Sequence, residues 1–428
     1  MPALSAQTGS LVGLLPPELC ASCVGRAFAR TEAAASNEDR GRGLRPDAPP
    51  VGPECPLCEG LPGRVEAYAR LCIEAAAVYE WDTFLVGSVL YREIRKREDE
   101  LYGQLSAQAP DHVRVAKEGE AAAPSFDLAE YLKAEINREV GKRVEASTGR
   151  RVDFQRPHIT FQVDTRLDAV RLQVASAYVE GRYRKHDRSM PQTRWPCRSC
   201  QGLGCRRCDF KGKTYEESVE EWVARPFLQA SGAAEEAFHG MGREDIDACM
   251  LGTGRPFVLE LKSPKRRRLD WSALAPRVAK ESGGRVEAFE VAGSDAAAPA
   301  RFKAADPEKT YVARCTAQGP VPPEALTEAL VALRGAELEQ RTPERVAHRR
   351  ADLVRRRRIL DLKLLAHDGD RFELEIRAES GTYIKEFVSG DEGRTRPSLA
   401  ARLAQPCRVT ELDVVAVHWT PPSPAAGL

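Results

Sequence analysis

The sequence has little net charge and no long apolar run. Its 428 residues carry 64 basic and 63 acidic side chains, so overall charge does not indicate a nucleic-acid partner, and local basic clusters would have to contact one. No run of about 18 apolar residues occurs, which argues against a membrane-spanning helix. The first residues lack a basic region and are interrupted by Pro16 and Pro17, so we do not expect a signal peptide. Neither a Walker glycine loop nor a dinucleotide fingerprint is present, so no organic cofactor is expected.

The cysteines, by contrast, are grouped. Cys20 and Cys23 form one CxxC motif, and Cys55 and Cys58 form another. The stretch between them, roughly residues 31–50, is rich in Ala, Arg, Gly and Pro, and we interpret it as a mobile insert. Four thiolates in a tetrahedron are a preferred ligand set for structural Zn²⁺. We therefore predict a zinc site, the alternative being four unrelated buried thiols.

A second cysteine cluster lies in the segment WPCRSCQGLGCRRCDFKG. Its cysteines are Cys197, Cys200, Cys205 and Cys208. Glycines between them allow tight turns whose amides can point at sulfur, so we again predict metal binding, although the short spacing leaves open whether all four thiolates meet one ion. The alternative is a labile redox pair, but Trp195, Arg198, Arg206 and Arg207 fit an RNA-facing metal module better. Since no signal peptide is expected, we expect a cytoplasmic protein, and in that reducing compartment paired cysteines more often hold metal than form disulfides.

Hydrophobic spacing predicts mixed helices and strands between the two clusters. Apolar residues recur every four positions along one segment, as in an amphipathic helix. They are Leu128, Leu132, Ile136, Val140 and Val144. Ser125 or Asp127 would lie near the cap of this helix, and residues 158–165 and 170–183 alternate as strands.

The C-terminal half contains several expected strands. Residues 255–262, 309–319 and 411–419 are interpreted as strands, and residues 294–305 as a loop. A densely basic stretch, residues 341–358, runs into two alternating segments joined by a turn at residues 367–370. This pattern predicts an antiparallel hairpin with outward arginines that could contact RNA phosphates.

The segment Met241–Leu261 places carboxylates close together in a glycine-rich context. Asp245 lies between Arg243 and Asp247 and directly follows Glu244. A neighbouring carboxylate raises a carboxyl pKa and an arginine lowers it, a balance suited to an ionised nucleophile or base. The charge pattern alone equally fits an acidic turn with structural ion pairs.

The longer pattern is more specific. Gly-Arg-x-Asp followed by a glycine-rich turn resembles the catalytic motif of pseudouridine synthases, and GREDID…MLGTGRPF resembles the archaeal-type branch that modifies positions 54 and 55 in the TΨC arm of tRNA. Two further segments, KTYVARC and GTYIK, resemble other motifs of that family. The region before the second cysteine cluster resembles the THUMP domain of RNA-modification enzymes.

The resemblance implies roles for individual residues. Asp245 would be the nucleophile, attacking either the sugar or the uracil ring. Tyr311 and Tyr383 would contact the target uracil, and Lys385 and Arg243 would keep the aspartate anionic and oriented. Leu399 would be an apolar residue of the pocket, with Leu403 close by in the sequence.

We therefore expect an α+β protein in which a zinc-binding, THUMP-like α/β accessory region precedes a catalytic domain with a mixed, largely antiparallel sheet. The expected segments are a zinc-knuckle region (1–60), a THUMP-like domain (61–195), a second knuckle (196–215) and a catalytic domain (216–428). The expected partner is tRNA, with no membrane and no obligate protein partner.

Two other classes of protein share some of these features. A non-catalytic zinc-containing RNA-binding protein would explain the cysteines and arginines, but not Asp245, Tyr311 and Lys385 in three separate motifs. A thiol-based oxidoreductase or chaperone would explain only the CxxC pairs, and it would need exposed thiols of low pKa rather than bound zinc.

Overall fold

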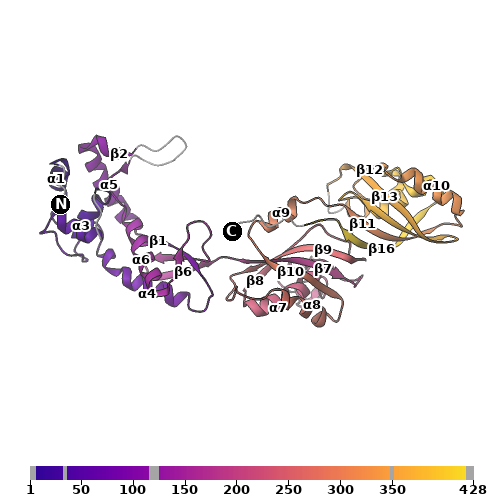
Figure 1. Ribbon diagram of the computed structural model, residues 1–428, viewed down its shortest axis with the longest axis horizontal. Coiled ribbons are helices and arrows are strands. Elements are labelled where there is room, and N and C mark those ends of the chain that lie inside the picture. The colour runs from indigo at the N-terminus through magenta and orange to yellow at the C-terminus, as the bar shows by residue number, and fades with distance from the viewer. Residues whose placement is uncertain (1–5, 32–35, 115–124, 348–350, 421–428) are drawn as a thin grey trace. The chain divides into compact units, whose positions relative to one another are not determined.

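The computed structural model describes residues 6–31, 36–114, 125–347 and 351–420 (Figure 1). The chain divides between Ala175 and Ser176 into two compact units, each with its own core. Along the described ranges, every helix is too short or too polar to cross a membrane. The expected α+β class is confirmed.

The first unit contains a four-stranded sheet with the order β4-β1-β5-β6. Its strands are β4 (Arg151–Val152), β1 (Thr83–Val89), β5 (Ile159–Asp164) and β6 (Ala169–Val174). Helices α4 (Val65–Ala75) and α6 (Leu132–Thr148) pack against this sheet. Trp81, Phe84 and Phe161 meet edge to face in its core, with centroids 5.5–5.9 Å apart. Large aromatic side chains in this geometry bury much apolar area and so hold the sheet to its helices.

One expectation for the helices of this unit needs correction. After β1 the chain forms a charged helix, α5 (Arg92–Gln108). Helix α6 begins at Leu132, after Tyr131 as N-cap, rather than near Leu128. The reason lies in a distant contact: the buried Glu98 of α5 accepts a hydrogen bond of 2.8 Å from the backbone N–H of Leu132, satisfying one of the donors that the start of a helix leaves open.

The segment interpreted as a mobile insert contains an ordered helix. Helix α3 (Asn37–Leu44) is capped by Ser36 and packs on α2 (Ala21–Ala27). Glycines at the crossing permit the approach, because a Cβ added at Gly41 would lie 1.8 Å from the carbonyl oxygen of Ala21. The described elements of this unit also include α1 (Ala6–Val12) and the pair β2 (Val113–Arg114) and β3 (Ser125–Phe126).

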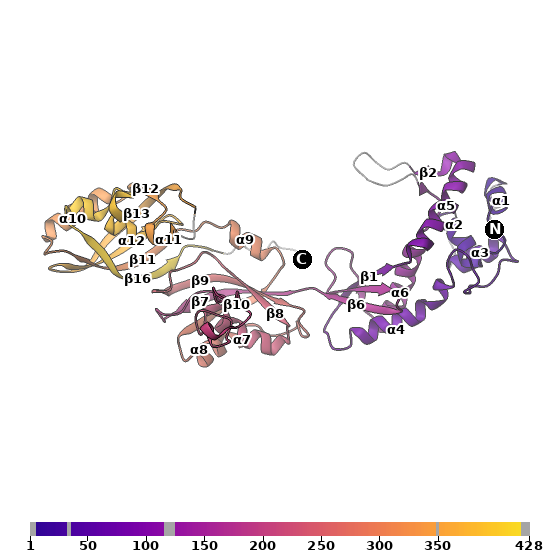
Figure 2. The ribbon, with the colours of Figure 1, turned by 180° about the vertical axis from the view of Figure 1, so that it is seen from behind.

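The second unit is built on a ten-stranded sheet with the order β10-β7-β9-β16-β11-β14-β13-β12-β15, and β8 pairs with β9 (Figures 1 and 2). The strands are β7 (Ala177–Lys185), β8 (Glu235–Gly240), β9 (Ala248–Lys262), β10 (Val286–Ser294), β11 (Lys309–Ala317), β12 (Glu337–Arg341), β13 (Val354–Asp368), β14 (Arg371–Ala378), β15 (Thr395–Arg396) and β16 (Cys407–Val417). All pairings are antiparallel except that of β9 with β16. The predicted hairpin is confirmed as β13 and β14.

Helices cover parts of this sheet. Helices α7 (Val219–Ser231) and α8 (Ala275–Ser282) pack on β10, α10 (Pro323–Leu333) packs on β13, and α12 (Ile384–Ser389) packs on β16. The remaining helices are α9 (Ala298–Ala304), α11 (Glu344–Ala347) and α13 (Leu399–Leu403). Helix α9 replaces the loop expected at residues 294–305.

The boundary between the units lies earlier than the sequence pattern suggested. The segment expected to be one strand, residues 170–183, is two: β6 ends in the first unit and β7 begins in the second. Strand β7 lies between β9 and β10, so it belongs to the sheet of the catalytic part and not to the THUMP-like region. Alternation of apolar and polar residues predicts a strand with one buried face, but it does not predict which sheet the strand joins.

Candidate active site

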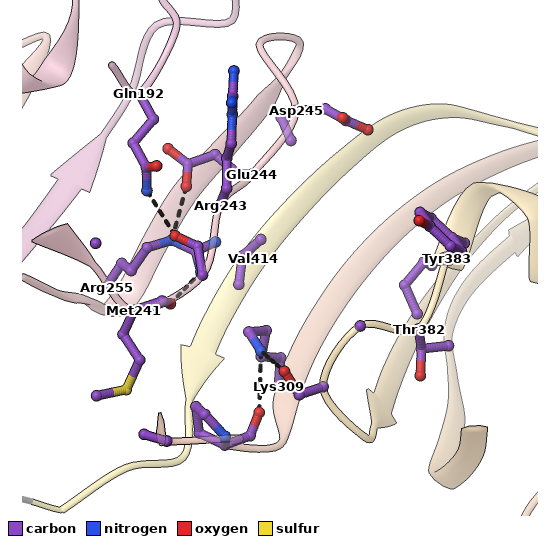
Figure 3. Close-up of a pocket in the computed structure, with 18 of the residues that line it drawn as sticks. Gln192, Met241, Arg243, Glu244, Asp245, Arg255, Lys309, Thr382, Tyr383 and Val414 are labelled. Carbon is purple, nitrogen blue, oxygen red and sulfur yellow. Dashed lines mark hydrogen bonds and ion pairs between the residues drawn. The ribbon is translucent and has the colours of Figure 1, made fainter. Parts of the chain in front are cut away.

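A cleft of about 1080 Å³ opens in the second unit. Its wall is formed by the loop between β8 and β9, by β11 and β16, and by residues before and within α12. Asp245, Lys309 and Tyr383 lie around the same opening (Figure 3). The sheet therefore brings three widely separated sequence motifs to one place.

The loop that carries Asp245 is held by a buried network. Arg255 donates from Nε to Glu244 Oε2 at 2.8 Å and from Nη1 to the carbonyl of Met241 at 2.9 Å. Tyr183 donates its hydroxyl to Glu244, and Gln192 donates to that hydroxyl at 2.8 Å. Arg255 is 1 % exposed, and a buried charge is tolerated when it is paired and hydrogen-bonded. Glu244 thus serves to fix the loop, which leaves its neighbour Asp245 facing the cleft.

A buried lysine holds the same loop from its other end. Lys185 is fully buried, and its Nζ donates to the carbonyl of Met190 at 2.9 Å and to that of Ile246 at 2.8 Å, with the carbonyl of Asp245 at 3.4 Å. Burial lowers the pKa of Lys185. Its three donors match three carbonyls, so the backbone on both sides of the Asp245 side chain is fixed.

The carboxylate of Asp245 has two basic neighbours. Arg345 Nη1 lies 2.8 Å from Asp245 Oδ2, and Lys385 Nζ lies 3.9 Å from the same oxygen. Lys385 makes its closer bonds, 2.9 and 2.7 Å, to the two oxygens of Asp247. Burial opposes ionisation of Asp247, but these bonds lower its pKa overall. Lys385 was expected to be the basic residue that pairs with Asp245, but Arg345 lies closer to its carboxylate.

Arg345 was not singled out by the sequence. It lies on α11, 100 positions after Asp245, in a stretch with many arginines. It also donates to Glu386 Oε1 at 2.6 Å. Burial opposes the charge of Arg345, but the hydrogen bond to Glu386 and the charge of Asp245 raise its pKa overall. No local pattern separates it from its neighbours, because only the fold places it opposite Asp245.

The two predicted tyrosines line the cleft. Tyr311 on β11 is 8 % exposed, and burial raises its pKa to about 12, against the opposing effect of Arg255. Its phenol therefore stays protonated at neutral pH. Tyr383 is the N-cap of α12, and its backbone is fixed by Gln340, which accepts from the Tyr383 amide at 2.9 Å and donates to its carbonyl at 3.0 Å.

Two other predicted residues differ from expectation. Arg243 lines the cleft, with its guanidinium carbon 5.1 Å from the centre of the Trp195 ring, and the short ion pair to Asp245 is made by Arg345. Leu399 is fully buried in the core at the start of α13 and is absent from the cleft lining. The apolar cleft residues include Ile384, Leu412 and Val414 instead.

Lys309 is a further charged residue in the cleft that the sequence did not mark. It is 6 % exposed, and its Nζ donates to Ser380 Oγ at 2.8 Å and to the carbonyl of Pro307 at 3.1 Å. Burial, and then the charge of Arg255, lower its pKa to about 8.

The first cysteine cluster converges as predicted. The sulfurs of Cys20, Cys23, Cys55 and Cys58 lie within 4.8 Å of one another, with Cys23 and Cys55 3.5 Å apart and Cys20 and Cys58 3.6 Å apart. A zinc ion about 2.3 Å from each sulfur requires separations of about 3.8 Å. Arg26, fully buried, donates to Cys23 Sγ at 3.4 Å and to Glu135 at 2.8 Å. The donor set fits a structural metal ion supported by a hydrogen-bonded second layer.

The second cluster also converges on one point. All four of its sulfurs lie within 4.8 Å of one another, with pairs at 3.8–4.0 Å. Backbone amides of Gly204, Cys205 and Gly212 donate to these sulfurs at 3.2–3.3 Å, as thiolate ligands require. The geometry answers the question that the spacing left open, because all four sulfurs can share one ion.

Comparisons with known proteins agree with this architecture. A family model described as "Pus10 THUMP domain, archaeal" matches residues 68–164, and one described as "Pus10, C-terminal" matches residues 178–418. Similar proteins are named tRNA pseudouridine synthase Pus10. That of Methanothrix thermoacetophila is 38 % identical, covering 94 % of this chain and 92 % of its own length. That of Archaeoglobus fulgidus is 39 % identical, covering 86 % and 96 %.

A THUMP domain, followed by a mixed sheet whose cleft presents an aspartate, two tyrosines and basic residues, defines a pseudouridine synthase, an isomerase. Within that class, the chain belongs to the Pus10 family.

Proposed function

We propose that this enzyme converts uridine to pseudouridine at positions 54 and 55 in the TΨC arm of tRNA, in the cytoplasm, with Asp245 as nucleophile. The observation that carries the proposal is the Asp245 carboxylate, presented to the cleft by a rigid loop and paired with Arg345 at 2.8 Å. An arginine at this distance favours the ionised, nucleophilic form.

The reaction is an internal rearrangement. The glycosidic bond from C1′ to N1 of uracil breaks, the ring turns within the cleft, and a bond forms from C1′ to C5. The proton on C5 is lost and N1 gains one, so atoms and electrons balance without a redox partner. Tyr311 lines the cleft, where its ring would contact the uracil and its hydroxyl would assist proton transfer from C5.

The target uridine lies inside a folded RNA arm, so it has to leave its stack to enter the cleft. That step costs a few kcal/mol. Contacts with the basic hairpin of β13 and β14 and with the THUMP-like unit would offset this cost, because phosphate contacts supply sequence-independent affinity. Arg355 and Arg357 of β13 line the cleft, so the basic hairpin extends to the cleft.

We also propose that the metal in both cysteine clusters is Zn²⁺ with a structural role. Four cysteine ligands close the coordination sphere and leave no position for substrate. A non-catalytic RNA-binding protein would share these metal sites, but it has no use for a paired carboxylate in a cleft lined by two tyrosines.

The test is pseudouridine formation on an unmodified tRNA transcript, mapped nucleotide by nucleotide. Asp245→Asn should lower the rate at least about a thousandfold, the order of loss expected for a nucleophile, while tRNA affinity stays near that of the wild type. Asp247→Asn is the matched control and should retain measurable activity. Retained activity of Asp245→Asn, or no modification at either position by the wild type, would contradict the proposal.

A further inference from the structure

The second cysteine cluster presents an unusual surface. Leu203 is 92 % exposed and Phe210 is 72 % exposed, and both belong to the same small metal-binding segment, residues 196–216. Gly204, which follows Leu203, lies close to the backbone of Phe210, because a Cβ added at Gly204 would be 2.9 Å from the carbonyl oxygen of Phe210. One short segment thus exposes two large apolar side chains, whereas a single exposed one would need no explanation.

The backbone beneath this surface is held in a strained form. Phe210 has φ +59°, and Asp209 and Gln201 each have φ +49°. A bulky residue rarely adopts this region, and such strain persists where the surroundings impose it, often at functional sites. Here the surroundings are the metal ligands: the Phe210 amide donates to the carbonyl of Cys205 at 2.9 Å, and Cys208 lies two positions before it. The segment therefore displays the Phe210 ring on a rigid base.

The charge around the two side chains is positive. The segment 196–216 has five basic and two acidic side chains, although the whole chain is nearly neutral. Arg198 and Arg206 are exposed, and no described carboxylate forms an ion pair with either. An exposed ring in the same short segment as exposed guanidinium groups can bind an unpaired nucleotide, with the base on the ring and phosphates on the arginines.

The base of the segment adjoins the cleft. Pro196 and Lys213 form a bridge, and the Thr214 amide donates to the carbonyl of Trp195 at 2.9 Å. Trp195 lies beneath the guanidinium of Arg243, which lines the cleft. An RNA strand leaving the cleft at this rim would therefore meet the cysteine segment next.

We propose that the surface formed by Leu203, Phe210, Arg198 and Arg206 binds the substrate RNA outside the cleft, by stacking an unpaired base on Phe210. This proposal rests on the proposed function, because it assigns a second contact to the same substrate. It also assigns a role to the second metal site, which would hold the backbone that carries the Phe210 ring.

The first experiment is photocrosslinking with the full chain carrying Asp245→Asn and p-benzoylphenylalanine in place of Phe210. Irradiation with a tRNA transcript should give a protein–RNA adduct that unlabelled tRNA competes away. The same group in place of Val331, an exposed residue of α10, should give none. Adducts only with protein, or none at all, would overturn the proposal.

The second experiment is kinetic. The double variant Leu203→Ser with Phe210→Ser should raise the KM for tRNA by about tenfold and leave kcat within about twofold, with both metal ions retained. Val331→Ser is the control. An unchanged KM in an enzyme whose wild type is active would overturn this proposal and leave the proposed function intact. A wild type without activity would overturn the proposed function, and the crosslink would still report RNA contact.

Discussion

Arg345 lies closer to Asp245 than Lys385 does: its Nη1 is 2.8 Å from Asp245 Oδ2, whereas the Lys385 Nζ is 3.9 Å from that oxygen and 2.7 Å from Asp247. Coulomb energy falls with distance, and a directed hydrogen bond adds to it. Arg345 therefore orients the carboxylate, and Lys385 contributes chiefly by restraining Asp247.

This relationship predicts a difference between two variants. Arg345→Met should lower the rate of pseudouridine formation by about a hundredfold, because a misplaced reacting group costs on that order. Lys385→Met should lower it less. Single-turnover rates on a tRNA transcript measure both, with Arg277→Met, a partly exposed arginine of α8 that pairs with Glu281, as control. The opposite ranking would assign the orienting role to Lys385.

Tyr311 should act in turnover more than in binding. Burial raises its pKa to about 12, so the phenol stays neutral and can only relay a proton, its oxygen accepting one from C5 as its own hydroxyl proton is donated. Tyr311→Phe keeps the ring and should lower kcat by about a hundredfold with little change in KM. Tyr178→Phe removes a hydroxyl bound to Glu260 away from the cleft and serves as control. A change confined to KM would limit Tyr311 to stacking.

Lys185 should stabilise the loop that carries Asp245. Lys185→Met leaves the carbonyls of Met190 and Ile246 without their donor, and we expect a loss of about 3 kcal/mol in unfolding free energy. Lys262→Met removes only a half-exposed ion pair with Glu235, worth at most about 1 kcal/mol. Denaturant unfolding of both variants makes the comparison, and equal losses would refute the role of Lys185.

Lys309 predicts a pH dependence. Its folded-state pKa of about 8 lies below the ordinary 10.5, so the cleft loses a positive charge as pH rises through about 8, and KM for the polyanionic substrate should rise over that interval. Stability should rise over the same interval. Above pH 8 the folded protein has lost the Lys309 proton that the unfolded chain still holds up to about pH 10.5, so the free energy of unfolding increases with pH.

The matched variant is Lys309→Met, which is neutral at every pH. Its KM should start higher and lose the inflection near pH 8, as a KM profile from pH 6.5 to pH 9 would reveal. If the inflection of KM near pH 8 persists in Lys309→Met, a group other than Lys309 causes it.

Metal content tests the two cysteine clusters. The full chain should carry two zinc ions, since each cluster can hold one. Cys58→Ser should remove one ion and unfold the first unit, because its cluster is buried with Arg26 and Glu135. Cys200→Ser should remove the other ion with a smaller loss of stability. Cys72→Ala, a buried cysteine outside both clusters, should keep both ions.

The local patterns predicted local structure well. The CxxC spacing identified both clusters, because two thiols three positions apart on a tight turn can share an ion wherever the turn lies. Period-two alternation identified the hairpin β13–β14 and the strand of Tyr311. The same patterns failed at residues 170–183 and 294–305. There, packing against the rest of the chain determines whether a strand continues and whether a helix forms.

The amino-acid sequence by itself determined which chemistry the chain carries: thiolates grouped for metal, and an aspartate, two tyrosines and a lysine spread over three motifs. Only the tertiary structure decided which of them meet. It placed Arg345 against Asp245, moved Leu399 into the core, and set Lys185 and Arg255 beneath the loop. Such contacts depend on strand order and register, which no local spacing encodes.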